Sequence, residues 1–300
     1  MKAVQFAEYG DPEVLHVVEV EEPHAGPGRI RIAVRAAGVN AIDWKIRAGF
    51  MREMRPLPLP SGSGMDAAGV VDEVGDGVSG VALGDEVFGT GSATLAEHAV
   101  LSSWATKPAD LPFEEAAGYP VPVETATRIL KEVGVQPGQT LLVSGAAGGV
   151  GSAVVQIARA RGITVIGTAS EGNQGYLRSL GAVATTYGAG LVDRVRPLAP
   201  NGVDAALDIA GHGVVTELIE LTGEPAKVLS IADFTAPEHG ARVSAGGRNG
   251  GAALEEGARL FSKGALRIAV AKTFPLAAAA EAHAASQAGH VAGRLVVTVP

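Results

Sequence analysis

Short β-branched hydrophobic runs, each closed by a glycine-rich turn, fill about the first hundred residues of the chain. Clear examples are "RIRIAVRAAGVN" (29–40) and "DAAGVVDEVGDGV" (66–78), and the proline-rich stretch 56–64 between them is expected to be a loop. The same style returns at the end of the chain in "GRLVVTVP" (293–300). The pattern predicts β structure in both terminal parts.

The pattern changes near residue 113. "FEEAAGYPVPVETATRILKEVG" (113–134) is expected to be helical in two pieces, broken by Pro120 and Pro122. Strands and helices then alternate with short connections, which indicates a parallel, doubly wound sheet. We therefore expect an α/β protein with a Rossmann-type domain over about residues 122–250. The predicted strands are 140–144, 163–170, 203–211 and 226–234, and the predicted helices are 150–161, 173–181, 214–223 and 276–288.

A run of small residues, "GAAGGVG" (145–151), joins the first predicted strand of this domain to its helix. Glycine costs backbone entropy, so the cluster indicates that something approaches the main chain closely. The spacing Ala146-x-Gly148-x-x-Gly151 is typical of a dinucleotide-binding turn, with phosphates at the helix N-terminus. The alternative is a turn whose glycines serve packing alone. The predicted cofactor-binding residues here are Ala146, Ala147, Gly148, Gly149, Val150 and Gly151.

The end of the second predicted strand bears on the choice between NAD and NADP. NAD-binding proteins usually place an acid there to hold the ribose hydroxyls. This strand ends in Thr168, Ala169 and Ser170, with Glu171 one residue later. A small neutral end favours a 2′-phosphate. The lack of any lysine or arginine before Arg178 argues against NADP. Arg178 itself is typical of a solvated helix face.

Composition excludes several other classes of protein. The net charge of −8 over 300 residues argues against nucleic acid as the main partner. The chain has no cysteine, which rules out disulfides and cysteine-zinc sites, and its 7 histidines lack ligand spacing, so we expect no metal. Neither a signal peptide nor an apolar run of about 20 residues is evident, so we expect a cytoplasmic protein without a membrane partner.

Four motifs, in order along the chain, resemble one known family. They are "AAGVNAIDWKIRAG" (36–49), "PLPSGSGMDAAGVVDEVGDGV" (58–78) followed by "GDEVFG" (84–89), "GAAGGVGSAVVQIARARG" (145–162) and "AGRLVVTVP" (292–300). The chain is similar to the zinc-free quinone oxidoreductase branch (zeta-crystallin type) of the medium-chain dehydrogenases/reductases.

The resemblance implies a GroES-like, β-rich catalytic domain of residues 1–121 and 251–300 around an inserted Rossmann domain of residues 122–250. It implies NADPH as hydride donor to a quinone or an α,β-unsaturated carbonyl (an enone), with cofactor and substrate meeting in the cleft between the domains. It also implies a homodimer.

The resemblance assigns roles at the nicotinamide end of the cofactor. Asn40 matches an asparagine beside the nicotinamide and the substrate carbonyl. Thr125 matches a threonine that contacts the cofactor. Ala210 and Ile231 match backbone loops that hold the nicotinamide.

The resemblance also assigns positions elsewhere. Ser170 and Tyr187 match positions near the adenosine phosphate, and Arg294, which is predicted to bind the cofactor, matches a position near the closing strand that is often basic. The basic residue expected just after Ser170 is missing, because residues 172–174 are Gly, Asn and Gln. The chain therefore keeps the outline of an NADP site without its usual cation.

Hydride transfer asks little of acid or base side chains, because the cofactor carries the chemistry. An amide such as that of Asn40 can stabilise the oxyanion that grows on the substrate, although Asn40 is equally typical of a turn that closes a strand. Lys45 and Met51 occupy the positions of the family's cleft tyrosines. Lys45 either stabilises an enolate or relays a proton, or it is a cleft-edge or surface lysine. Asp43 is expected to bond to nearby backbone, so the predicted catalytic residues are Asn40 and Lys45.

Three functions remain open at this point. The first is an NADPH-dependent reductase of quinones or enones. The second is an enoyl reductase that tailors a polyketide or another specialised metabolite. The third is an NADPH-binding protein with little turnover, to which the missing tyrosines leave room.

Overall fold

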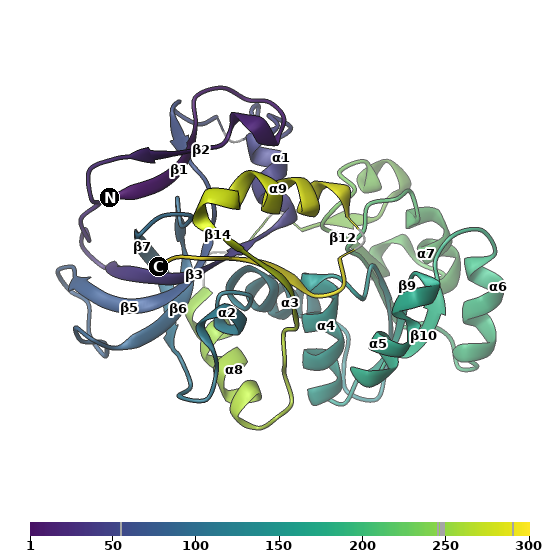
Figure 1. The fold of residues 1–300 in the computed structure, drawn as a ribbon. Helices are drawn as coiled ribbons and strands as arrows, with labels where there is room; N and C mark the ends of the chain where they lie inside the picture. Colours follow the sequence, from purple (N-terminus) through teal and green to yellow (C-terminus); the bar gives the residue numbers. More distant parts are fainter. Residues whose placement is uncertain (55, 245, 247–249, 290) are drawn as a thin grey trace. The chain divides into compact units, whose positions relative to one another are not determined.

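The computed structural model describes residues 1–54, 56–244, 246, 250–289 and 291–300. The chain divides into two compact units. Unit 1 comprises Met1–Val121, Asn249–Ser262 and Ile268–Pro300, so both chain ends, purple and yellow in Figure 1, belong to it. Unit 2 comprises Pro122–Arg248 and Lys263–Arg267. The expected division at residues 121/122 and 250/251 differs from this one in two places: it assigns residues 249–250 to the Rossmann domain and residues 263–267 to the domain of the chain ends.

Unit 1 is built on a six-stranded sheet in the order β14-β15-β3-β5-β6-β7. β3 also pairs with β7, which closes β3, β5, β6 and β7 into a ring. Alternate residues in the first half of β3 are buried, as expected for a strand with one face in a core. The strands of unit 1 are β1 (Lys2–Phe6), β2 (His16–Glu19), β3 (Ile30–Val39), β4 (Ser61–Gly62), β5 (Asp66–Val74), β6 (Glu86–Ser92), β7 (His98–Thr106), β14 (Val270–Pro275) and β15 (Arg294–Thr298). Its helices are α1 (Ala41–Arg47), α2 (Phe113–Ala116), α8 (Gly250–Ser262) and α9 (Ala279–Ala288).

Unit 2 is a six-stranded parallel sheet in the order β10-β9-β8-β11-β12-β13. Counted from β8, this is the 3-2-1-4-5-6 order of a dinucleotide-binding sheet, with its switch of direction between β8 and β11. The predicted fold class, a GroES-like domain with a Rossmann-type domain, is confirmed. The strands are β8 (Thr140–Ser144), β9 (Thr164–Ala169), β10 (Val183–Thr186), β11 (Ala205–Asp208), β12 (Val228–Ser230) and β13 (Arg242–Val243), and the helices are α3 (Pro120–Val133), α4 (Gly149–Ala160), α5 (Gln174–Ser179), α6 (Leu191–Val195) and α7 (Val215–Thr222).

The helical stretch around residue 120 differs from the prediction in one respect. The helical conformation is interrupted between α2 and α3, and α3 begins at Pro120. Pro122 lies inside the first turn of α3 and does not break it, because a missing N–H costs nothing where helical N–H groups have no intrahelical partner. Across the described residues, no helix combines the length and apolar character needed to cross a membrane.

Candidate functional site

The glycine turn of unit 2 joins β8 to α4. The N–H groups of Gly145 and Ala146 donate to Thr168 on β9, at 3.3 Å to its Oγ1 and 3.0 Å to its carbonyl O. Gly148 is the N-cap of α4 and has an extended backbone (φ −73°, ψ 175°). The N–H groups of the first helical turn have no intrahelical acceptors and are therefore available to an anion.

Gly148 and Gly151 have different surroundings. A Cβ on Gly151 would lie 2.2 Å from the carbonyl O of Gly145 and 2.7 Å from the Cα of Ala146, so only glycine lets α4 pack against the turn. A Cβ on Gly148 would meet nothing closer than the carbonyl O of Gly145, at 3.7 Å. Packing therefore explains Gly151 but not Gly148, where space is left at the N-terminus of α4. This space fits the close approach of a pyrophosphate to the backbone.

Parallel pairing brings the ends of the strands to one edge of the sheet. Ser144, the last residue of β8, pairs with Asp208, the last residue of β11, and Asp208 pairs with Ser230 at the end of β12. Thr186, the last residue of β10, pairs with Ala169 at the end of β9. Doubly wound sheets bind ligands at this carboxyl edge. The residues that follow these strand ends include the turn 145–151, Ser170, Tyr187, Ala210 and Ile231.

Two residues that the sequence analysis missed, Asp208 and Ser230, order the turns on one half of this edge. Both are fully buried. Oδ1 of Asp208 accepts the N–H groups of Ala210 and Gly211 at 3.1 and 3.0 Å. Oδ2 of Asp208 accepts the Ser230 hydroxyl at 2.8 Å, and Ser230 Oγ accepts two N–H groups of the turn after Ile231, at 3.1 and 2.9 Å. The sequence did contain a signal for Asp208: it is an acid at the end of a buried strand, two residues before the small pair Ala210 and Gly211.

Gln174 ties together the other half of the edge. It is buried, and its Nε2 lies 3.0 Å from the carbonyl O of Ala169, 3.3 Å from that of Ser170 and 2.9 Å from that of Thr185. The place where a basic residue was expected thus holds an amide that joins β9 to β10. Tyr187 is 54% exposed at the same edge. Thr125, by contrast, comes from α3 and not from a strand end; it is buried beside Glu124.

In unit 1, Asn40 directly follows β3 and is the N-cap of α1. Its N–H donates to Asp43 Oδ2 at 2.7 Å, which confirms the prediction that Asp43 bonds to backbone. The side-chain Nδ2 of Asn40 donates to Asp66 Oδ2 on β5 at 2.9 Å. Asn40 is therefore both a residue that closes a strand and an amide with a fixed orientation.

Asp66 is fully buried and connects three parts of unit 1. Its Oδ1 accepts the N–H of Val121 at 3.0 Å. Its Oδ2 accepts a hydrogen bond from Arg294 Nη2 at 3.1 Å, in addition to the one from the side chain of Asn40. Arg294, which the resemblance suggested for the cofactor, is 5% exposed, and its guanidinium is the counter-ion of Asp66. A Cβ at Gly38 would lie 2.4 Å from the carbonyl O of Ala117 and 2.9 Å from this guanidinium, so β3 must have glycine there.

Burial dominates the electrostatics of this cluster. It raises the pKa of Asp66 to about 6, although Arg294 and the Asn40 amide favour the ionised carboxylate. Burial, with a smaller contribution from Asp66, raises the pKa of Asp43 to about 7. Burial also lowers the pKa of Arg294, against the attraction of both carboxylates. Two buried acids with pKa values raised toward neutrality therefore hold Asn40: Asp66 accepts from its side-chain amide, and Asp43 accepts from its backbone N–H.

Lys45, the other predicted catalytic residue, lies on α1. Its Nζ is 5.9 Å from the centroid of the Trp44 ring, and Trp44 packs edge-on against Phe50 at 5.8 Å between centroids. Within the described part of the chain, Lys45 forms no ion pair that would fix its ammonium. Phe50, which precedes Met51, is 70% exposed.

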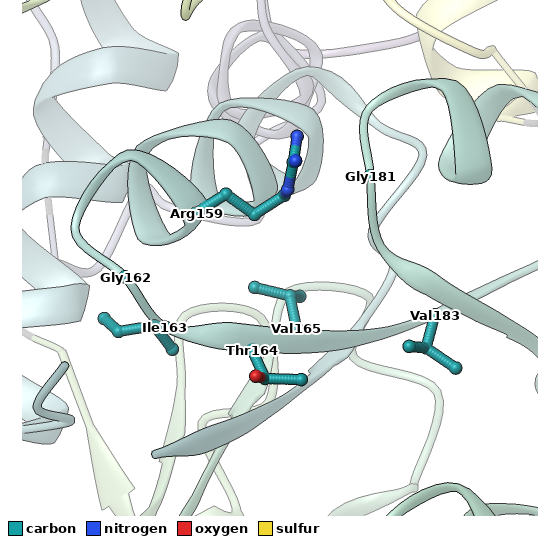
Figure 2. Close-up of a pocket in the computed structure, with 7 residues that line it drawn as sticks. All are labelled: Arg159, Gly162, Ile163, Thr164, Val165, Gly181 and Val183. Carbon is teal, nitrogen blue, oxygen red and sulfur yellow. The ribbon is translucent and has the colours of Figure 1, made fainter. Parts of the chain in front are cut away.

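A surface pocket of about 280 Å³ lies elsewhere in unit 2. Figure 2 shows it at the amino ends of β9 and β10, where its lining includes Arg159, Thr164, Val165 and Val183. Ligands of doubly wound sheets bind at the opposite, carboxyl edge. None of the predicted site residues lines this pocket, so it is not the cofactor site.

Comparison with known protein families gives two matches. Residues 26–107 match the alcohol dehydrogenase GroES-like domain, and residues 180–297 match a family described as zinc-binding dehydrogenase. In the residues that the structure describes, no three His, Cys, Asp or Glu side chains gather as a metal ion would require.

Individual proteins extend these matches over the whole chain. The quinone oxidoreductase of Sus scrofa is 32% identical over 307 residues, which cover 94% of this chain and 93% of that protein. The pikromycin polyketide synthase component PikAII of Streptomyces venezuelae is 35% identical over 97% of this chain, which spans 8% of its length. A mycobacterial protein solved in complex with NADPH superposes with a TM-score of 0.85 at 28% identity, covering 99% of this chain and 100% of that one. The chain belongs to the zinc-free quinone oxidoreductase branch of the medium-chain dehydrogenase/reductase superfamily, and is an oxidoreductase of that superfamily.

Proposed function

We propose that the protein is an NADPH-dependent reductase of quinones or enones that works without zinc. The observation that carries the proposal is the free space at Gly148, at the N-terminus of α4 and the carboxyl edge of the sheet. β9 and β10 lie on one side of β8, and β11 and β12 lie on the other. A dinucleotide with its pyrophosphate at Gly148 therefore extends toward Ser170 and Tyr187 at one end, and toward Ala210 and Ile231 at the other.

When bound, the nicotinamide supplies the hydride, and the residues of the chain hold and orient it. The turns at Ala210 and Ile231 suit the nicotinamide because Asp208 and Ser230 fix their backbones. Ser170 and Tyr187 suit a 2′-phosphate, since both offer hydroxyl donors and no acid lies in line with β9. Hydroxyls discriminate less than charged donors, so we expect a preference for NADPH over NADH on the order of tenfold in kcat/KM.

Asn40 is the proposed donor to the oxygen of the substrate. An amide has two N–H donors, and Asp66 takes one of them. The second is left for the oxyanion that forms as hydride arrives. Because Asp66 can only accept while ionised, it fixes which end of the amide carries the hydrogens. The absence of cysteine from the sequence supports a zinc-independent reaction.

An enoyl reductase of specialised metabolism is the second candidate. The similarity to the polyketide synthase component PikAII, over 97% of this chain, favours it specifically. The reaction has the same donor and the same oxyanion, so both candidates use Asn40 in the same way. They differ only in the acceptor.

Steady-state kinetics on a panel of acceptors tests these candidates. The panel contains a naphthoquinone, a simple enone and an enoyl thioester, each with NADPH and with NADH, on protein treated with a chelator. The proposal expects NADPH oxidation with the quinone or the enone at the higher rate. Turnover of the thioester alone would select the enoyl reductase. Tight NADPH binding without oxidation by any acceptor would leave a binding protein.

We also propose a homodimer, as the family resemblance implies. Light scattering coupled to size-exclusion chromatography tests it, and a mass of one chain at micromolar concentration would contradict it.

A further inference from the structure

One side chain holds the whole loop that follows β10. Arg194, on α6, places Nη1 2.6 Å from the carbonyl O of Ala189. Its Nη2 lies 3.1 Å from the carbonyl O of Thr186, 3.3 Å from that of Tyr187 and 2.9 Å from that of Gly188. Four successive carbonyl groups therefore turn toward a single guanidinium. The conformation of the loop that carries Tyr187 depends on Arg194.

This loop lies beside the end of β9. Thr186 and Ala169 are register partners on adjacent parallel strands, so Tyr187 and Ser170 leave the sheet side by side. Gln174 bridges the two strand ends through carbonyl groups of both. The end of the second strand is where dinucleotide-binding sheets distinguish a 2′-hydroxyl from a 2′-phosphate. Arg194 therefore binds the loop that lies next to the position where this choice is made.

The positive charge of Arg194 is not neutralised. Its partners are carbonyl groups, which carry no net charge, and no carboxylate of the described residues lies within ion-pair distance of it. Its Nε is buried without a hydrogen-bond partner. Arg196, two residues later, differs in this respect, because it is exposed and pairs with Glu220 at 2.7 Å. Arg194 is therefore a local cation where the sequence, read linearly, showed none near Ser170.

We propose that Arg194 is the residue through which unit 2 selects a 2′-phosphorylated adenosine, by ordering the loop of Tyr187 and by placing an uncompensated positive charge beside the end of β9. The inference rests on the proposed NADPH dependence and deepens it. Arg194 acts as a positioning residue, since the carbonyl groups of the loop occupy its Nη1 and Nη2 and its positive charge acts on the phosphate from a distance. The missing cation after Ser170 is replaced from a different element.

Calorimetric titration with two adenosine fragments tests the inference without turnover. Adenosine 2′,5′-bisphosphate carries the 2′-phosphate, and adenosine 5′-monophosphate lacks it. In Arg194→Gln, we expect affinity for the bisphosphate to fall roughly fivefold, the size typical of a partly exposed charge pair, with affinity for the monophosphate nearly unchanged. Arg194→Lys keeps the charge without the planar fork, so its selectivity should be intermediate. Arg196→Gln, the matched control, should leave both affinities unchanged.

The outcomes separate the inference from the proposal beneath it. A wild-type preference for the bisphosphate that survives in Arg194→Gln overturns the inference and leaves NADPH dependence intact. Equal wild-type affinities overturn the NADPH preference itself, and the absence of binding by either fragment overturns the dinucleotide site.

The salt dependence of the wild-type preference provides a second test that needs no variant. The net charge of −8 repels an added phosphate, so a wild-type preference that falls with rising salt requires a local cation, and one that rises contradicts the inference.

Discussion

Replacing Gly148 by valine should separate cofactor binding from folding. The backbone of Gly148 is extended, at φ −73° and ψ 175°, so any residue can adopt it. Its Cβ would be 3.7 Å from the nearest atom, so the protein does not need to move. Loss of glycine at an N-cap costs up to about 1 kcal/mol. We therefore expect a folded protein whose Tm falls by only a few degrees.

The effect on NADPH should be far larger. The side chain of valine fills the space proposed for the pyrophosphate, in front of the first N–H groups of α4. Hydrogen bonds to charged groups contribute about 1.5–3 kcal/mol each. Losing two of them amounts to at least about 3 kcal/mol, which is more than a hundredfold in Kd. Calorimetric titration with NADPH measures this, and circular dichroism with thermal melting measures the fold.

Two other glycines serve as controls. Gly251→Ala on α8 adds a Cβ 4.0 Å from the nearest atom, so neither Tm nor Kd should change for the worse. Gly151→Ala puts a Cβ 2.2 Å from the carbonyl O of Gly145, so this variant should lose stability as well as binding. A folded Gly148→Val protein with unchanged NADPH affinity would refute the reasoning, because the space would then not be the pyrophosphate site.

Three further substitutions test the buried groups of unit 1. Asn40→Ala should lower kcat about a hundredfold, as removal of an oxyanion donor does, while the Kd of NADPH stays similar; equal loss in both would contradict a role at the substrate. The folded-state pKa of Asp43 is raised to about 7, so this group stabilises the fold below about pH 4 and loses that contribution as pH rises to 7. Chemical denaturation should therefore show that Asp43→Asn removes a loss on the order of 4 kcal/mol across that window, and an unchanged pH slope would disprove it. Burial, with the nearby charge of Arg47, lowers the pKa of His283 to about 4, so its contribution is present above about pH 6.5 and is lost as pH falls to 4. His283→Gln should reduce that loss of stability at acid pH by on the order of 3 kcal/mol, and a slope that persists would assign it to other groups.

The parallel sheet and its glycine turn were predictable because both rest on local patterns. Strand–helix alternation set the order of the elements, and the spacing of Gly148 and Gly151 marked the turn that joins β8 to α4. Short helices were less visible. α1 has 7 residues and follows a strand without a break, and α8 begins with glycines that weaken its hydrophobic period.

The contacts that order the candidate site were not predictable, because they join residues far apart in the chain. Asp66 and Arg294 are separated by 228 positions, and Asp208 and Ser230 by 22. Sequence reading could suggest a role for Asn40 but not that Asp66 orients its amide. In the same way, Arg194 was passed over because its closeness to Ser170 depends on the pairing of β9 with β10. Local patterns predicted the turn of the candidate site, and tertiary pairing determines which side chains lie around it.

Transfer of deuterium from NADPH to an enone tests the central claim most directly. The protein is stripped of metal with a chelator, mixed with NADPH deuterated at C4 of the nicotinamide on the face that is transferred, and allowed one turnover. Mass spectrometry of the saturated ketone should show one deuterium at the β-carbon, with a primary isotope effect on the rate of NADPH oxidation. The result that would contradict the account is a protein that oxidises no NADPH until zinc is restored, or a product that carries no deuterium.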